Sequence, residues 1–461
     1  MSQPSTEPEL KRDLGMGPAV SIVVGTVIGS GIFLVPQSMI QRVGSVEMVF
    51  AVWIVGGLLS LAGALSYAEL AAALPEAGGE YVYLREAYGP LWGFLYSWTQ
   101  MWVAKSGSIA TLATGFFLYL ANFFPRLETV FYTTPLPLGP NGGPLEFRYG
   151  QLLAISLILS LAWLNYYGVK LGGTVQAAVT ALKVGLIALI IVAGLGFGRP
   201  HAAQAAGIAP LTFAGFIAAL VAALWAYDGW NNVSMVASEV RNPQRNLPLA
   251  LIGGTLSVIA IYLLANGAYF RVLAAGEVAG SPRVAADMMG RILNGAGANA
   301  VSIAAMISIF AALNGSILSG SRVPYAAARE GYFFAAVGTV NSRHRTPGGS
   351  IVGLSLWSCL LVLSGKYDDL FNLVIFASWI LYGMTAAAVV VLRIKKPALP
   401  RPYRTLGYPV VPLLFVLGAA VLVVSTLFDR RRESLMGVGL MVAGLPFYFH
   451  WKKSRVRSPI P

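Results

Sequence analysis

The sequence predicts an all-α integral membrane protein with twelve transmembrane helices. Two compositional observations point to this class: 56% of the 461 residues are hydrophobic and only 11% are charged, with a mean hydropathy of +0.69. Soluble domains carry roughly 25% charged residues, so a soluble fold is excluded. The third observation is that apolar runs long enough to cross a bilayer recur along the whole chain. We therefore expect one polytopic domain at 15–453, between cytoplasmic tails at 1–14 and 454–461.

Each expected span is an apolar run close to or above twenty residues long. The six spans of the first half are Met16–Ile40, Glu47–Leu74, Leu91–Phe124, Tyr149–Tyr167, Thr174–Gly196 and Thr212–Ser238. The six spans of the second half are Asn246–Phe270, Ala298–Ala328, Pro347–Ser364, Asp368–Leu392, Tyr408–Leu427 and Leu435–Trp451. An even number of spans places both termini on the same side of the membrane.

The basic residues indicate the orientation of these spans. The net charge of +13 is spread over short connections between apolar runs, so we expect a lipid bilayer and no nucleic acid as partner. Most of the 32 Lys and Arg residues fall on the inner side when the N-terminus is placed inside. This bias predicts a protein of the plasma (inner) membrane with both termini in the cytoplasm.

The chain offers few groups for covalent or metal chemistry. The one cysteine, Cys359, lies within an apolar run, and the three histidines lie near the ends of segments. We find no nucleophile–base set, no metal-ligand cluster and no phosphate-binding loop in the sequence. We therefore expect neither an enzyme nor a cofactor.

The first span contains a stretch that should interrupt its helix. Three glycines, Gly25, Gly29 and Gly31, fall within seven residues. Glycine costs about 1 kcal/mol relative to Ala in a helix, and lipid cannot satisfy the backbone groups that a break frees. A break is therefore expected where the backbone faces protein or a water-filled cavity. The amide groups of the second half-helix, starting near Ile32, would then hold an anion such as a carboxylate.

The sixth span contains a second interruption, at 225–232. Asp228, Gly229, Asn231 and Asn232 fall at mid-membrane depth, where a charge costs on the order of 3 kcal/mol and usually marks a functional interior. Two breaks that lie five spans apart predict a five-plus-five inverted repeat whose discontinuous first and sixth helices meet at a midplane site. The repeats would cover about 15–196 and 212–392, with two extra C-terminal helices at about 408–452.

Each break taken alone also has a simpler interpretation. Gly25 and Gly29 form a GxxxG pattern, which serves close helix packing. Asp228 and Gly229 would fit a loop that was wrongly placed within a span. Because both breaks occur at corresponding positions of the two halves, we favour the interpretation as a substrate site.

Two lysines lie within spans. Lys183 is near the centre of the fifth span, about 14 Å from either end, too deep for its side chain to reach the interface easily. Its ammonium should face the interior, where it would replace a bound cation or carry a proton; a structural interhelical bond is the alternative. For Lys105, in the third span, a functional and a structural role are equally open.

Polar groups near the inner ends of spans have simpler roles. We expect Glu69, Glu239 and Glu330 to be interfacial or gate-forming groups. The connection after the second span, Pro75–Tyr83, is polar and aromatic, and we expect it to lie along the membrane surface.

An ordered set of motifs extends over nearly the whole chain. It comprises GTVIGSGIF at 25–33, YAEL at 67–70, PEAGGEY at 75–81, AYDGWN at 226–231, EVRNPQRNLP at 239–248, NGS at 314–316, SR at 321–322 and AREG at 328–331. Through these motifs the chain resembles the L-type amino acid transporter family of the amino acid–polyamine–organocation superfamily, from about Lys11 to Lys453. A single motif of this kind would be weak, whereas the ordered set is specific.

The resemblance implies a sodium-independent amino acid transporter that works by alternating access, an exchanger of neutral L-amino acids. It implies that the substrate carboxylate binds Ser30, Gly31 and Ile32. It further implies a set of residues around the substrate ammonium, on both breaks: Ile28, Gly29, Trp225, Ala226, Tyr227 and Asp228. Trp225 matches an aromatic residue that closes the outer side. Lys183 matches a lysine that stands where related transporters bind sodium.

Three departures from the family pattern bear on function. Lys105 is followed by Ser106, where the family often has proline. Asp228 replaces a small or neutral residue and is similar to members that accept dibasic substrates, so proton-coupled uptake of cationic amino acids or polyamines is the alternative. The connection 125–148 lacks the cysteine through which animal members join a heavy subunit, so no disulfide-linked partner is expected. A transport-inactive sensor or membrane scaffold is a third possibility, disfavoured because the site residues are present.

Overall fold

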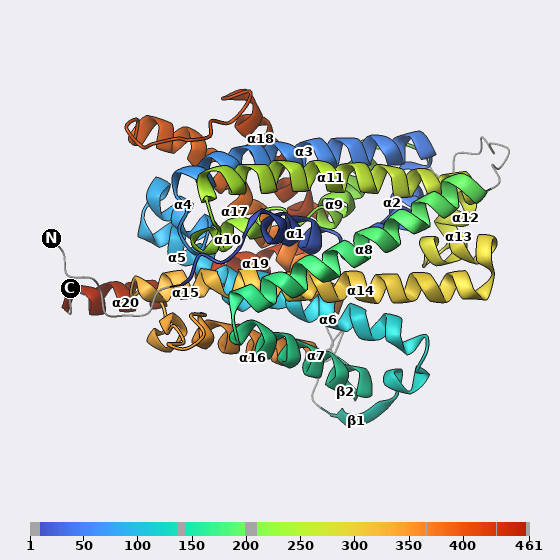
Figure 1. Cartoon of the computed structure of the whole chain (residues 1–461), viewed down its shortest axis with the longest axis horizontal. Helices are drawn as coiled ribbons and strands as arrows, with labels where there is room; N and C mark the ends of the chain where they lie inside the picture. The colour runs from blue at the N-terminus through green and yellow to red at the C-terminus, as the bar shows by residue number, and fades with distance from the viewer. Residues whose placement is uncertain (1–9, 136–142, 199–209, 365–366, 430, 458–461) are drawn as a thin grey trace.

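The computed structural model describes residues 10–135, 143–198, 210–364, 367–429 and 431–457. The outermost parts of both expected tails, 1–9 and 458–461, and part of the expected outer connection, 136–142, lie outside these ranges. Most of the described chain is helical, and the long helices run along one direction of the molecule (Figure 1).

The helices of the first half follow the expected spans closely. They are α1 (Met16–Val27), α2 (Gly31–Val43), α3 (Val46–Ala73), α4 (Glu80–Tyr88), α5 (Pro90–Thr99), α6 (Lys105–Ala121), α7 (Tyr149–Tyr166) and α8 (Val169–Phe197). A π-helical turn at Gln100–Ala104 joins α5 to α6, so the third span is one long, locally distorted helix.

The second half begins with the other interrupted span. Its helices are α9 (Phe213–Ala226), α10 (Asn232–Met235), α11 (Pro243–Val272), α12 (Ala275–Gly280), α13 (Val284–Leu293), α14 (Gly295–Gly320), α15 (Arg322–Arg329), α16 (Gly348–Leu363), α17 (Tyr367–Lys395), α18 (Val410–Asp429), α19 (Arg431–Val442) and α20 (Leu445–Arg457). Ten helical segments of the described chain are long and apolar enough to cross a membrane. The shorter apolar helices α9 and α16 stand where two more spans are predicted.

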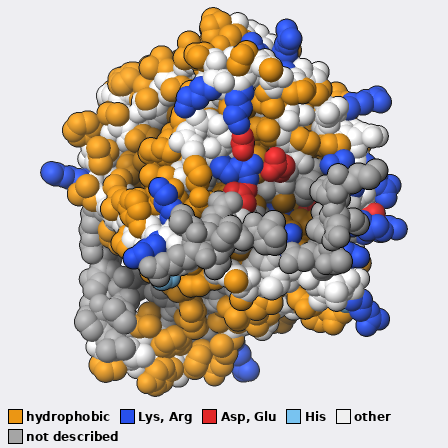
Figure 2. Space-filling view, turned by 90° about the vertical axis from the view of Figure 1, so that its left-hand side faces the viewer, with side chains coloured by type: hydrophobic (Ala, Val, Ile, Leu, Met, Phe, Trp, Pro, Cys, Tyr) orange, Lys and Arg blue, Asp and Glu red, His pale blue; other side chains and the backbone are white. Residues whose placement is uncertain are grey.

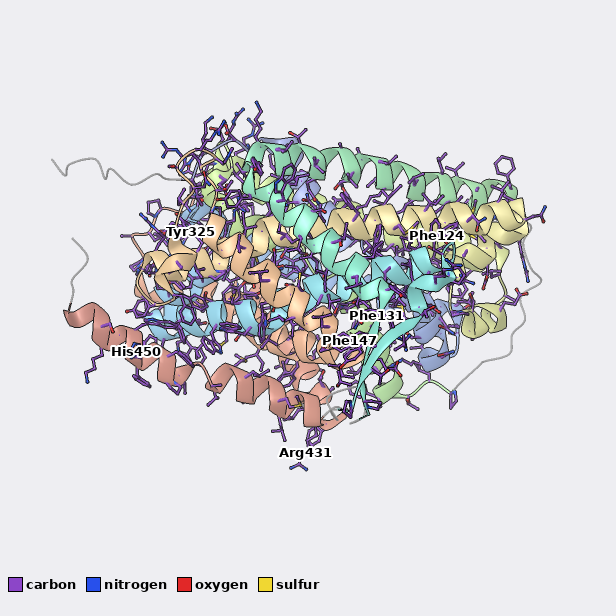
Figure 3. The ribbon with its side chains drawn as sticks, turned by 90° about the horizontal axis from the view of Figure 1, so that it is seen from below. Phe124, Phe131, Phe147, Tyr325, Arg431 and His450 are labelled. Atoms are coloured by element: carbon purple, nitrogen blue, oxygen red, sulfur yellow. The ribbon has the colours of Figure 1, made fainter. Side chains whose placement is uncertain are left out.

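The described chain is all-helical, as predicted, apart from one short hairpin in the connection 125–148. Strands β1 (Val130–Thr134) and β2 (Leu145–Arg148) form an antiparallel pair in which Thr133 lies opposite Glu146. The β1 sequence, VFYTT, consists of β-branched and aromatic residues, which favour an extended chain. Figure 1 shows this hairpin at the lower edge of the bundle, and Figure 3 labels Phe131 and Phe147 near each other on its two strands.

Three further differences concern helices. No helix was predicted in the connection 271–297, but the structure has two there, α12 and α13, which pack against α2 and α14. The twelfth expected span is divided into α19 and α20 at Gly444, where a Cβ atom would lie 2.9 Å from the indole of Trp98. The connection 75–83 is exposed only near its start, at Glu76: α4 packs against α5 and α17, and Glu80, Tyr81 and Tyr83 are completely buried.

Both ends of the described chain lie at one end of the bundle. Figure 1 shows α4, α10, α15 and α20 at its left-hand end, whereas α12 and α13 lie at the right. In Figure 3, Tyr325 and His450 lie toward this same left-hand end, and Phe124 lies toward the other. We call the left-hand end the termini end. An arrangement with both termini together agrees with an even number of crossings.

Candidate functional site

The first break separates α1 from α2 where the glycines predict it. The chain leaves the helix at Ile28–Ser30 and resumes it at Gly31. A Cβ atom on Gly31 would lie 2.8 Å from the Cβ of Ala226, the last residue of α9, so only glycine allows this approach. The amide groups of Gly31 and Ile32 have no helical turn before them to bond, whereas the Phe33 amide donates to the Ser30 carbonyl oxygen at 3.1 Å.

The carbonyl groups freed at this break have side-chain donors. Lys183 Nζ, on α8, donates to the carbonyl oxygen of Gly25 at 2.7 Å and to that of Ile28. The Ser308 hydroxyl lies 2.9 Å from the same Ile28 oxygen. Because the Lys183 side chain is completely buried, its charge is held mainly by these backbone oxygens. The Ile28 carbonyl, expected to hold a substrate ammonium, therefore already accepts hydrogen bonds from Lys183 and Ser308.

The second break lies between α9 and α10. The chain turns at 227–231, and Gly229 adopts φ +109°, a conformation that disfavours other residues. Two hydroxyl groups join this break to the first. Thr26 Oγ1 lies 2.9 Å from the Gly229 carbonyl oxygen, and the Tyr262 hydroxyl lies 2.7 Å from the Ala226 carbonyl oxygen and 3.1 Å from that of Val27.

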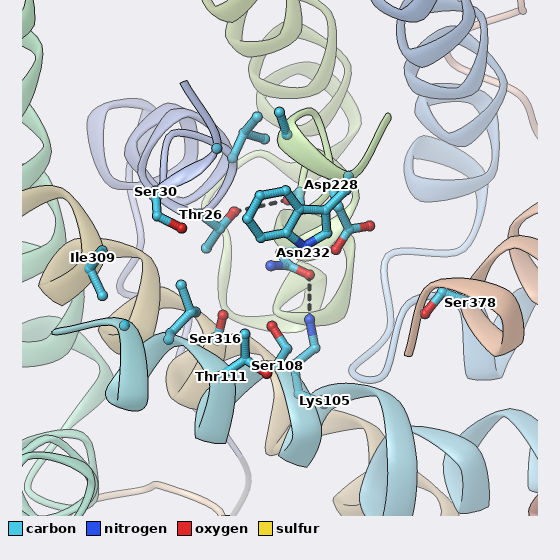
Figure 4. Close-up of a pocket in the computed structure, with 18 of the residues that line it drawn as sticks. Thr26, Ser30, Lys105, Ser108, Thr111, Asp228, Asn232, Ile309, Ser316 and Ser378 are labelled. Carbon is cyan, nitrogen blue, oxygen red and sulfur yellow. Dashed lines mark hydrogen bonds between the residues drawn. The ribbon is translucent and has the colours of Figure 1, made fainter. Parts of the chain in front are cut away.

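A pocket lies between the two breaks, α6, α14 and α17 (Figure 4). Its lining is Thr26, Val27, Gly29, Ser30, Gly31, Lys105, Ser108, Thr111, Leu112, Gly115, Trp225, Ala226, Asp228, Gly229, Asn232, Ile309, Ser316, Ser378 and Trp379. The empty space amounts to about 870 Å³, including open solvent. The lining therefore combines hydroxyl groups, two tryptophans and two opposite charges, Lys105 and Asp228.

The pocket contains most of the expected substrate-binding residues, but not all of them. Those that line it are Gly29, Ser30, Gly31, Trp225, Ala226 and Asp228. The side chains of Ile28 and Ile32 are completely buried elsewhere, and the Tyr227 hydroxyl bonds the Trp53 carbonyl oxygen at 3.2 Å. Lys183 lies behind the first break and is not part of the lining. Asp228 accepts a hydrogen bond from the Tyr382 hydroxyl at 3.0 Å.

Lys105 is the pocket residue whose role the sequence left open. Its ammonium donates to Asn232 Oδ1 at 2.8 Å, as Figure 4 shows, and it is almost completely buried. It places a positive charge in the same cavity as Asp228. Its one indication in the sequence is that a lysine stands within an apolar run. No feature of the sequence marked Thr26, Ser316 and Ser378 as pocket residues, because hydroxyl residues are common in membrane spans.

Buried contacts close the pocket toward the termini end. Arg322 Nε and Nη2 donate to the two carboxylate oxygens of Glu239 at 2.6 and 2.9 Å, and both side chains are completely buried. Leu14 pairs with this segment, its amide donating to the Glu239 carbonyl at 2.9 Å and its carbonyl accepting from Arg241 at 2.8 Å. We call Leu14, Glu239, Val240 and Arg322 the sealed end.

The other two expected gate or interfacial acids are also paired. Glu69 bonds Arg393 at 2.9 and 2.6 Å, and Glu330 pairs with Arg85. Figure 2 shows acidic and basic side chains gathered near the middle of the termini end. In the opposite direction the pocket lining continues along α6 from Lys105 to Gly115, away from the sealed end.

Comparison with known proteins gives full-length matches. A family model described as amino acid permease matches residues 14–447. The b(0,+)-type amino acid transporter 1 of Homo sapiens is 34% identical over 100% of this chain and 93% of its own. The serine/threonine exchanger SteT of Bacillus subtilis is 33% identical over 97% and 98%. The large neutral amino acids transporter small subunit 2 of Homo sapiens is 33% identical over 95% and 80%.

Proposed function

The chain belongs to the amino acid permease family, and we propose that it exchanges amino acids across a membrane by alternating access. The resemblance predicted from the motifs is thereby confirmed, and the chain is a multi-pass membrane protein of a transporter family. The observation that carries the proposal is the polar pocket between two broken helices, closed at one end by a buried ion pair. A site that one side can reach while the other is sealed is what alternating access requires.

The proposed architecture has twelve spans, in which α9 and α16 complete the ten longer helical segments. Spans one to five, at about 15–196, and six to ten, at about 212–392, form the inverted repeats, and α18 to α20 lie outside them. The contacts Thr26–Gly229 and Tyr262–Ala226 support this arrangement, because they join the two breaks at one depth.

The proposed substrate is an amino acid bound by backbone groups. Its carboxylate binds at the start of α2, on Ser30, Gly31 and Ile32, where the helix dipole and free amides favour an anion. Its ammonium lies near Asp228 and the backbone carbonyl groups of the second break. Trp225, in the pocket wall, closes the outer side over it. The neutral-substrate preference is part of this proposal, since the relatives' names span several substrate classes.

Sodium independence follows from Lys183. Its ammonium already bonds the Gly25 and Ile28 carbonyl oxygens, the kind of ligands that a sodium ion would need. We place the protein in the plasma (inner) membrane with the termini end in the cytoplasm, as the distribution of basic residues favours. A disulfide-linked partner is not part of the proposal, because the single cysteine, Cys359, is buried in α16.

Uptake of labelled amino acids into sodium-free proteoliposomes tests the function. The vesicles are empty, preloaded with unlabelled amino acid, or given an inward proton gradient. We expect uptake only into preloaded vesicles, with the same rate when sodium is added. Proton-driven uptake into empty vesicles would support a proton-coupled permease instead. Binding without flux in every condition would support a sensor.

A second candidate, proton-coupled uptake of cationic amino acids or polyamines, is favoured by one observation. The Asp228 carboxylate lines the pocket, where it would attract a second positive charge on the substrate. Under this candidate Asp228→Asn lowers uptake of cationic substrates at least several-fold more than uptake of neutral ones. Equal effects on both classes would exclude it.

A further inference from the structure

Glu80 is a buried acid that the proposed transport cycle does not use. It begins α4, in the connection between the second and third spans, and it is completely buried. Its Oε1 accepts a hydrogen bond from the Asn231 side chain, and its Oε2 lies 3.4 Å from Ser234 Oγ. The amide of Gly78 donates to the Met235 carbonyl at 2.9 Å. The start of α4 is therefore attached to the segment that follows the second break.

The surroundings of Glu80 do not supply a counter-charge in contact with it. The titratable groups that face it come from five elements: Tyr67 of α3, Tyr83 of α4, Tyr96 of α5, Lys105 of α6 and Tyr382 of α17. Among the described residues no Lys, Arg or His pairs with its carboxylate, and the ammonium of Lys105 donates to Asn232. An ionised carboxylate buried without a paired cation is costly, and such groups take up a proton.

The neighbouring amide bonds the carboxylate, but its effect on the pKa of Glu80 is smaller than the opposing effect of burial. Within the part of the chain that the structure describes, the buried Asn231 Oδ1 has no hydrogen-bond partner, although its Nδ2 donates to Glu80. A carboxylate can only accept hydrogen bonds, whereas a protonated carboxyl group can also donate one. The neutral acid has a proton to donate to an acceptor such as this amide oxygen, which the ionised form leaves unpaired. Consistently, desolvation by burial raises the pKa of Glu80 to about 7.

We propose that Glu80 is a proton-binding site, loaded while the sealed end is closed and unloaded when that end opens. The proposal rests on the proposed alternating access. Opening must displace Glu239 and the segment after the second break, to which Glu80 is attached, and this admits water to the carboxyl group. A proton that binds one conformation more tightly than the other makes their equilibrium depend on pH. One proton enters from water and returns to water, and no other reactant is needed.

The first test compares exchange by wild type and Glu80→Gln at matched pH on both sides, between about pH 5 and about pH 8. The glutamine side chain has the shape and neutrality of the protonated acid. We therefore expect exchange by Glu80→Gln to be flat where the wild-type rate changes several-fold near neutral pH. Glu76→Gln, in an exposed position of the same connection, is the control and should keep the wild-type profile. A Glu80→Gln profile that matches wild type would overturn the proposal.

A second measurement needs no transport. Infrared difference spectra of the solubilised wild type should contain a protonated carboxyl band that disappears as the pH rises through about 7 and is missing in Glu80→Gln. Because folding raises this pKa, the stability it adds is complete below the unfolded value of about 4.3 and is lost as the pH rises through 7. The melting temperature of wild type relative to the variant should fall over that window.

The two measurements separate the two proposals. A wild type that shows the titrating band but exchanges at no pH would overturn the proposed transport function and still support proton binding. A wild type that exchanges but lacks the band would overturn the proton-binding site and leave the transport function standing. If Glu80→Gln does not fold, Asp228→Asn assigns the band instead: the band should persist there if it belongs to Glu80 and disappear if it belongs to Asp228.

Discussion

At the scale of single residues, Lys183 was the most predictable part of the site. A lysine near the centre of an apolar span has few options, because its charge must find oxygen atoms inside the protein. The structure supplies the carbonyl groups of Gly25 and Ile28. Lys105 was harder, since the sequence could not place Asn232 beside it. The Glu80 environment was missed altogether, because polarity suggested a surface position for a segment that is buried.

Lys183→Ala should lower exchange about tenfold or more. The substitution removes a charged donor from two backbone oxygens at the break, and a hydrogen bond to a charged group is worth roughly 1.5–3 kcal/mol. Exchange in preloaded proteoliposomes measures the effect, and the melting temperature shows whether the fold survives. Lys170→Ala, at an exposed position of the same helix, is the matched control. Unchanged rate and affinity in Lys183→Ala would contradict the role given to this lysine.

At the scale of elements, the spans and both breaks could be predicted because each has a local cause. Length and apolarity define a span, and clustered glycine or buried polar residues interrupt it. Elements that depend on distant partners could not be predicted. Helix α4 is buried by its packing on α5 and α17, and α12 and α13 are ordered by α2 and α14. The turn between α19 and α20 lies at Gly444, where the Trp98 indole, a residue distant in the sequence, leaves no room for a side chain.

Glu239→Gln should open the sealed end. Removing one partner of a completely buried ion pair leaves the other charge uncompensated, which costs about 3–5 kcal/mol. The conformation in which Arg322 is exposed to water should therefore become more populated. The measurement uses a Cys359→Ser background with Ser316→Cys in the pocket wall, labelled with an impermeant thiol reagent from the termini end.

We expect labelling of this cysteine to be at least about tenfold faster in Glu239→Gln, since 1.4 kcal/mol corresponds to a factor of ten. Glu146→Gln breaks the exposed pair with Arg148 in the hairpin and should leave the rate unchanged. Equal labelling in both variants would mean that the Arg322–Glu239 pair stabilises the fold without controlling access.

At the scale of the whole molecule, composition alone settled the class, and the count of basic residues suggested an orientation. The structure adds that α20 and the start of the described chain lie at one end, with the β1–β2 hairpin away from it. The positive-inside bias enriches basic residues on the cytoplasmic side of membrane proteins. Applied to this chain, the bias favours the termini end as the cytoplasmic side.

Topology can be tested with single cysteines in a Cys359→Ser background. Lys452→Cys introduces a thiol at an exposed position of α20, and Tyr132→Cys introduces one on the exposed face of β1. An impermeant reagent added to intact cells should label the hairpin cysteine alone, and permeabilised cells should show both. The reverse pattern would place the termini end outside. It would also put Glu80 and the sealed end in contact with the external medium, so that external rather than cytoplasmic pH would control the proposed proton site.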